Sequence, residues 1–118
     1  MKYKYFKESE FKCKCGKCEN KISSELITKL DEARKLAGVP FVITSGYRCR
    51  DYNNDLLKRG YKASPNSSHM LGLAADIAVN DKTREIIYQA LKKAGFVRIG
   101  AAHNFIHADI DTGKPQTE

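Results

Sequence analysis

The chain has 118 residues, of which 42% are hydrophobic and 30% charged, a size and composition that predict one small folded domain and exclude global disorder. Its 21 Lys and Arg residues against 14 Asp and Glu residues give a formal net charge of +7, which favours an anionic partner such as nucleic acid, a membrane surface or a cell-wall polymer. No apolar run approaches the roughly 18–20 residues that span a membrane, and the first residues show no apolar stretch typical of a signal peptide.

The first part of the chain is expected to hold a cap segment, a helix and a strand. Residues 1–21 carry seven Lys, three Glu and three of the four Cys, and predict an extended, loop-like cap rather than part of the core. Ser23 or Ser24 is a suitable N-cap for a helix whose apolar residues recur every three or four positions until Gly38. The β-branched run at residues 41–47 predicts a short strand.

The rest of the chain alternates turn signals with short periodic segments. In chain order these are a helix capped by Asp51 and ending near Gly60, a polar loop at 61–68, a strand at 73–79, a helix from Asp81 to Gly95, and strands at 96–100 and 105–110. This order predicts a single small α+β domain over residues 1–118, with helices packed on a mostly antiparallel sheet.

Asp76 is an acid in an otherwise apolar strand. Its own strand face carries only Ala74 and Ala78 beside it, and a buried unpaired carboxylate is very costly. The partner is expected to be a metal ion or an arginine. Gly72 permits a tight turn, through which His69 and Asp76 can converge on one ion.

The last expected strand places His107 and Asp109 on one face, together with Phe105 and Asp111. A single histidine on a half-buried strand is more often structural than catalytic. Two neutral imidazoles and one carboxylate together, however, form a common catalytic zinc set that leaves a fourth position for water.

These residues belong to motifs whose running order resembles a known family. The motifs are Glu10-Phe-Lys-Cys-Lys-Cys15, Thr44-Ser-Gly-Tyr-Arg48, Ser67-x-His69-x-x-Gly72-x-Ala74-x-Asp76 and Phe105-Ile-His107-x-Asp109. Over about residues 6–115 the chain resembles the D-alanyl-D-alanine carboxypeptidase-like zinc peptidases of family M15, which share the hedgehog/DD-peptidase fold. The ten-residue Ser/His/Asp motif carries most of the specificity.

The resemblance implies one catalytic Zn²⁺ bound by His69, Asp76 and His107. It further implies that Arg48 holds a substrate carboxylate or stabilises the developing oxyanion, and that Ser67 hydrogen-bonds beside the metal. The expected reaction is hydrolysis of an amide bond in the stem or cross-link peptides of peptidoglycan, by either a carboxypeptidase or an endopeptidase.

The general base is less well defined by the motifs. Relatives place an acid three residues before the last zinc histidine or a histidine two residues before it, and these positions are Asn104 and Phe105 here. Neither side chain can accept the proton. We therefore expect Asp109 to act as the base, because it shares a face with His107, with His103 as the alternative.

The four cysteines, Cys13, Cys15, Cys18 and Cys49, form a second group. The Cys15-x-x-Cys18 spacing around a glycine is typical of half a zinc knuckle, so a second, structural zinc held by four thiolates is one alternative. One or two disulfides, or free thiols, are the others, although Cys13–Cys15 is a poor disulfide pair. In either bonded case the N-terminal segment would be fastened beside Arg48.

Two other functions compete with a peptidase. One is a non-enzymatic, zinc-stabilised binding or structural module, for example a phage or virion component. The other is a nucleic-acid binder. This function is not expected, because the sequence shows no evident aromatic residues for stacking on bases. We expect a monomer that acts on peptidoglycan peptides, is made in the cytoplasm, and reaches the cell wall through phage- or prophage-type release.

Overall fold

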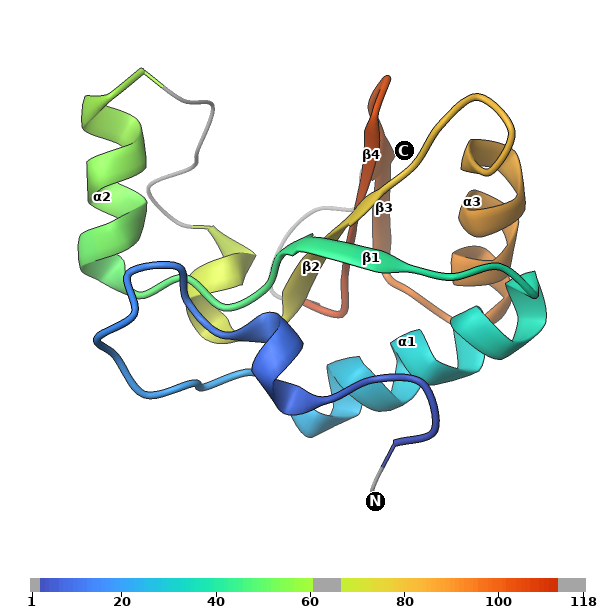
Figure 1. The fold of residues 1–118 in the computed structure, drawn as a ribbon, viewed down its shortest axis with the longest axis horizontal. Helices are drawn as coiled ribbons and strands as arrows, with labels where there is room; N and C mark the ends of the chain where they lie inside the picture. Colours follow the sequence, from blue (N-terminus) through green and yellow to red (C-terminus); the bar gives the residue numbers. More distant parts are fainter. Residues whose placement is uncertain (1–2, 61–66, 113–118) are drawn as a thin grey trace.

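A four-stranded antiparallel sheet forms the centre of the computed structural model, which describes residues 3–60 and 67–112 (Figure 1). The strands are β1 (Val42–Ser45), β2 (Ala74–Ala78), β3 (Arg98–Ala101) and β4 (Phe105–Asp109), in the spatial order β1-β2-β4-β3. The helices are α1 (Ser24–Ala37), α2 (Arg50–Lys58) and α3 (Arg84–Lys93), with short 3₁₀ turns η1 (Glu8–Phe11) and η2 (Ser68–Leu71). The predicted α+β class and antiparallel sheet are therefore confirmed.

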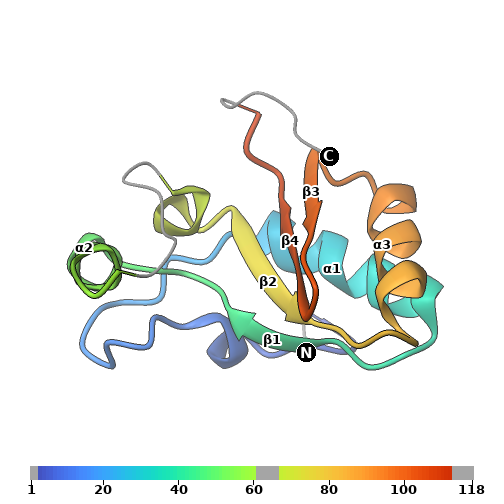
Figure 2. The ribbon, with the colours of Figure 1, turned by 90° about the horizontal axis from the view of Figure 1, so that it is seen from above.

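Helices α1 and α3 cover one face of the sheet, while α2 lies beyond the end of β1 (Figure 2). The covered face carries the alternate residues of the two central strands, Ala75, Ile77, Ile106 and Ala108, and all four are fully buried in the core. The strand alternation predicted from the sequence is confirmed. Consequently Asp76 and its neighbours on the other face point away from the helices.

Helix α1 begins and ends where the sequence predicts. The Ser23 side chain accepts a hydrogen bond from the amide of Leu26, and Gly38 closes the helix in the left-handed region at a φ of 70°. Ser23 satisfies one of the amides that lack a partner in the first helical turn, and glycine adopts the positive φ without steric cost.

The caps of the other two helices differ from the prediction. Helix α2 follows Cys49, whose sulfur accepts from the amide of Tyr52, so Asp51 lies inside the helix. Helix α3 follows Thr83 rather than Asp81, because the Asn80 side chain accepts from the two amides that follow Asp81. In both places a residue before the predicted aspartate supplies the acceptor near the helix start, namely Cys49 for α2 and Asn80 for α3.

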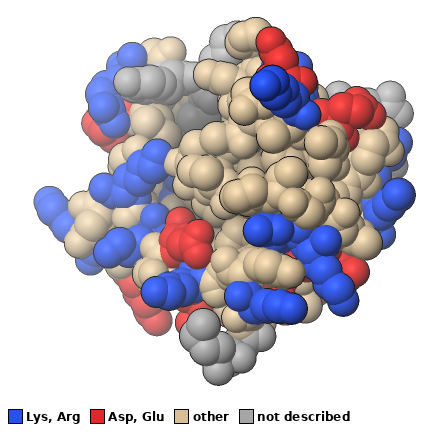
Figure 3. Space-filling view, turned by 45° about the vertical axis from the view of Figure 1, so that its right-hand side comes forward, with Lys and Arg blue, Asp and Glu red and all other residues tan. Residues whose placement is uncertain are grey.

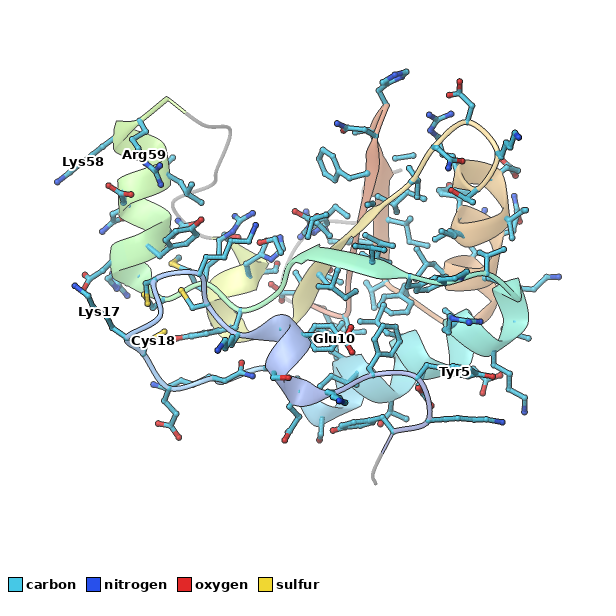
Figure 4. The ribbon with its side chains drawn as sticks, viewed as in Figure 1. Tyr5, Glu10, Lys17, Cys18, Lys58 and Arg59 are labelled. Carbon is cyan, nitrogen blue, oxygen red and sulfur yellow. The ribbon has the colours of Figure 1, made fainter. Side chains whose placement is uncertain are left out.

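The prediction that residues 1–21 lie outside the core is wrong. Tyr3, Phe6 and Phe11 are buried, and the Phe6 ring lies 5.6 Å from that of Phe11. The backbone amides of Lys4 and Tyr5 donate to the Asp31 carboxylate of α1 at 3.2 and 2.7 Å, which fixes the segment along that helix (Figure 4). Aromatic side chains between lysines supply the apolar area that a count of aliphatic residues misses.

The predicted polar loop 61–68 lies mostly outside the described residues, and its last two residues, Ser67 and Ser68, are buried. Within the described part of the chain, no helix has the length and apolar character needed to cross a bilayer. On the face shown in Figure 3, Lys and Arg side chains lie around an area of uncharged residues, with acidic side chains among them. The positive charge on this face is spread out rather than gathered into one patch.

Candidate active site

Three residues from three elements meet on the uncovered face of the sheet. His69 lies in η2, Asp76 in β2 and His107 in β4, where the sheet register pairs it with Asp76. The Asp76 Oδ1 atom lies 3.3 Å from His69 Nε2 and 2.9 Å from His107 Nδ1. One ligand atom from each residue lies within 4.8 Å of the others, so the structure brings together the three expected metal ligands.

His69 is oriented by a backbone carbonyl. Its Nδ1 lies 2.7 Å from the carbonyl oxygen of Gly46, and since a carbonyl can only accept, Nδ1 must carry the proton. Nε2 is therefore the ring nitrogen left to face Asp76, across a separation of 3.3 Å. When Nε2 carries no proton, its lone pair and the carboxylate oxygen would hold a cation between them.

His107 lies between two carboxylates. Its Nδ1 faces Asp76, and its Nε2 lies 2.8 Å from Oδ2 of Asp109, which is fully buried. The same Oδ2 pairs with Arg98 Nη1 at 3.2 Å. With a cation at Nδ1, Asp109 would hold the ring by accepting the Nε2 proton, an arrangement common around zinc histidines.

The electrostatics of the site favour a cation. Burial by itself raises the pKa of Asp76, but hydrogen bonds from His107 and His69 outweigh it and hold that pKa well below its usual range. Burial lowers the pKa of His107, but the carboxylates of Asp109 and Asp76 raise it to about 9. In the metal-free protein a proton on His107 thus supplies positive charge where a metal would bind.

The ligand spacing also fits zinc. Ligand atoms at about 2.0–2.1 Å from a tetrahedral zinc lie roughly 3.3 Å from one another. The 2.9 and 3.3 Å separations from Asp76 Oδ1 match this value within a few tenths of an ångström. His69, Asp76 and His107 are therefore the residues that would hold the metal.

Arg48 lies beside the three ligands, with its Nη2 3.6 Å from Asp76 Oδ2 and its Nε donating to Ser45 Oγ at 3.2 Å. Ser67 is buried, and its hydroxyl accepts from the backbone amide of His69 at 3.1 Å. Arg48 is thus close to the cluster with its charge partly engaged. Ser67 is engaged in forming the turn that carries His69.

The two residues expected as general base lie in different settings. His103 is exposed on the turn between β3 and β4, where its carbonyl accepts from Arg84, and it lies outside the metal-ligand cluster. His103 precedes the first residue of β4 by two positions, whereas His107 lies in the middle of that strand. Asp109 lies at the cluster, but it is buried between His107 and Arg98.

An apolar strip lies next to the ligands on the same sheet face. Ala78 is paired with Val42 on one side and with Phe105 on the other, two residues along each strand from the ligand pair. Val42 is 60% exposed and Phe105 is 37% exposed. The uncovered face therefore offers apolar contact area beside the metal ligands.

Sequence reasoning missed two contributors to the site. The Gly46 carbonyl carries no signal in the sequence, because any residue has a carbonyl and only the fold aims this one at His69. Arg98 is the second, and it pairs with Asp109 rather than with Asp76. A buried acid in the last strand and an arginine in the preceding one are the signal that could have revealed this pair.

The four cysteines form a second cluster, between the N-terminal segment and the start of α2. Their sulfur atoms all lie within 4.8 Å of one another, and none is bonded to another. Figure 4 shows Cys18 and Lys17 on the N-terminal loop beside α2, with sulfur atoms gathered there. The structure therefore brings together the residues expected to fasten the N-terminal segment.

Comparison with known proteins agrees with this geometry. The family described as Peptidase M15 matches residues 4–109. The crystal structure of the L-Ala D-Glu endopeptidase ChiX of Serratia marcescens is similar in fold, with a TM-score of 0.63 and 16% sequence identity over 77% of this chain and 81% of that one. No curated protein sequence matches this chain.

Proposed function

Because the chain belongs to the Peptidase M15 family, we propose that it is a zinc-dependent enzyme that hydrolyses amide bonds in the stem or cross-link peptides of peptidoglycan. The observation that carries this proposal is the convergence of His69, Asp76 and His107 on one point of the open sheet face. The similarity in fold to an L-Ala D-Glu endopeptidase supports peptidoglycan as the substrate.

Zinc bound by His69 Nε2, Asp76 and His107 Nδ1 would supply a Lewis acid and would lower the pKa of a bound water toward neutrality. The Gly46 carbonyl and the Asp109 carboxylate hold the two imidazoles in the tautomers that leave these nitrogen atoms free. We assign Asp109 a positioning role, because it is buried and its Oδ2 is engaged by His107 and Arg98.

Arg48 is placed to bind an anionic group of the substrate or to stabilise negative charge that develops on the scissile carbonyl oxygen. Its guanidinium lies 3.6 Å from Asp76 and is mostly buried, so its charge acts with little screening by water. The exposed rings and methyls of Phe105 and Val42 would contact the small apolar side chains of a stem peptide.

Digestion of purified sacculi, followed by mass spectrometry of the released fragments, tests the proposal and names the bond that is cut. The wild type is expected to release peptide fragments, and His69→Ala to release none. His103→Ala is the matched control, because it removes an imidazole that lies on the exposed turn, and we expect it to keep full activity. If the zinc-loaded wild type released no fragments from several types of cell wall, the proposed enzymatic function would be refuted.

A non-enzymatic zinc-stabilised binding module is the second candidate. Two observations favour it. Asn104 and Phe105 occupy the positions where relatives are expected to carry a proton acceptor, and Asp109 is buried. Co-sedimentation with sacculi separates the two candidates. Binding that is retained without release of fragments would support the module.

A further inference from the structure

We propose that Cys13, Cys15, Cys18 and Cys49 bind a second zinc ion as four thiolates, at a structural site separate from the histidine site. This proposal does not depend on peptidase activity. All four sulfur atoms lie within 4.8 Å of one another, although Cys49 is 31 residues beyond Cys18 in the sequence. Packing alone would not require four sulfur atoms to lie this close together.

The sulfur spacing matches a tetrahedral thiolate site. A zinc–sulfur bond of about 2.3 Å places the corners of a regular tetrahedron roughly 3.8 Å apart. The observed separations are 3.7 Å for Cys13–Cys49, 3.8 Å for Cys49–Cys15 and 3.4 Å for Cys15–Cys18. A set of four sulfurs at these distances favours zinc among the common divalent metals.

Backbone amides support three of the four sulfurs as anions. The amides of Lys17, Cys49 and Tyr52 each lie 3.4 Å from a sulfur, donating to Cys15, Cys13 and Cys49 respectively. Gly16 makes the first of these contacts possible, because its φ of 74° turns the chain between Cys15 and Lys17. Such amide bonds to sulfur are the outer contacts that hold thiolates around a metal.

The surroundings compensate the charge and leave an entry path. Zinc with four thiolates carries two negative charges, and Lys17, which lines the pocket beside the cluster, supplies a positive charge there. A pocket lined by Cys15, Lys17, Cys18, Cys49, Asp51, Tyr52 and Asp55 opens beside the cluster. A metal ion can therefore reach the sulfurs from solvent.

The site would fix the strand end that serves the histidine cluster. The amide of Tyr47 donates to the Phe11 carbonyl at 2.7 Å, so the segments of Cys13 and Cys49 already run together there. Gly46 and Arg48, which contact His69 and Asp76, lie in the same stretch. The zinc ion would stabilise the position of helix α2 most, because Asn53 is the one residue of this helix that is buried in the described part of the chain.

Metal analysis of the purified full chain tests the proposal. We expect two zinc ions per chain in the wild type and one in Cys49→Ser. Serine is itself a good N-cap, so this variant removes a ligand while keeping the start of α2. Lys14→Ala is the matched control from the same loop and is expected to keep both ions, because Lys14 is exposed and is not a ligand.

His69→Ala separates this proposal from the proposed function. It should lose the other zinc and keep the thiolate-bound ion. In the wild type and in His69→Ala, Co²⁺ substituted for zinc should show thiolate-to-cobalt charge-transfer absorption, and Cys49→Ser should lack it. This spectrum requires no activity, so failure of the sacculus digestion would leave it intact.

The proposal is overturned by any of three results. One is a wild-type chain that binds a single zinc and loses it in His69→Ala. Another is disulfide bonding of the four cysteines, seen as lost thiol reactivity in protein purified without oxidant. The third is iron in place of zinc, which would retain the thiolate site but refute the metal assigned to it.

Discussion

Replacing Gly46 by alanine is the sharpest test of how the candidate active site is built. Gly46 is buried, and a β-carbon added to it would lie 2.6 Å from both the Cα and the carbonyl oxygen of Phe11. Ordinary van der Waals contact begins at about 3.4 Å, so roughly 0.8 Å must be relieved. Because the obstructing atoms are backbone, no side chain can turn away to make room.

The displacement would reach the metal ligand directly. The Gly46 carbonyl holds Nδ1 of His69 at 2.7 Å, and a shift of about 0.8 Å would lengthen this contact to about 3.5 Å, beyond a useful hydrogen bond. Overpacking costs about 1–3 kcal/mol, or very roughly 4 °C of Tm per kcal/mol for a domain of this size. Loss of the group that orients His69 should weaken zinc binding about 10–100-fold.

Thermal unfolding and chelator competition measure the two effects. The competition is read on the zinc equivalent that His69→Ala removes. Gly100→Ala is the control, because Gly100 lies in β3 and a β-carbon there meets no atom within 4 Å. If Gly46→Ala kept the Tm and zinc affinity of the wild type, the close approach of Phe11 and the role of the carbonyl would both be refuted.

Three further predictions concern Asp109, the pH dependence of stability and Phe105. Asp109→Asn should weaken zinc binding about 10–100-fold and recover activity at saturating zinc, whereas unchanged zinc affinity with a kcat about 10²–10⁴-fold lower would make Asp109 the general base. The metal-free protein should lose stability as the pH rises from 6.5 to about 9. Folding raises the pKa of His107 from 6.5 to about 9, so the protonated imidazole stabilises the fold at low pH and this contribution is lost as the proton leaves. It should also lose stability as the pH falls below about 4, where the unfolded chain takes up protons before the depressed pKa of Asp76 is reached; urea unfolding between pH 3 and 10 would contradict both if the profile were flat. Phe105→Ala should raise KM for stem peptides without changing zinc content. Ile86→Ala removes a similarly exposed apolar side chain on α3 and should leave KM unchanged.

The elements that could be predicted from the sequence are those set by neighbours in the chain. Helix α1 begins after Ser23 and ends at Gly38 as expected, because capping acts within one turn of a helix. The strand faces were also correct, because alternation is a property of each strand by itself. The predicted N-caps of α2 and α3 were wrong. At each helix start two possible acceptors lie within three residues, and the local sequence does not show which of them accepts.

The candidate metal ligands could be predicted for a related reason. His69 and Asp76 stand in one ten-residue motif, and His107 stands on the partner strand at the position that pairs with Asp76. A strand pairing aligns such residues automatically once the register is set. The residues that orient them carry no comparable pattern, since the contact of Gly46 with His69 joins segments 23 residues apart.

Element order and strand alternation are local properties of the chain, and they were enough to predict the fold class and which residues share a strand face. The three candidate ligands were predicted from motifs that resemble those of a known family. Only the tertiary structure decided that the lysine-rich N-terminus enters the core, that Asp109 is buried against Arg98, and that Cys49 joins the other three cysteines. Each of these depends on contacts between segments far apart in the sequence. Such contacts are fixed by the packing of the whole domain rather than by any one stretch of residues.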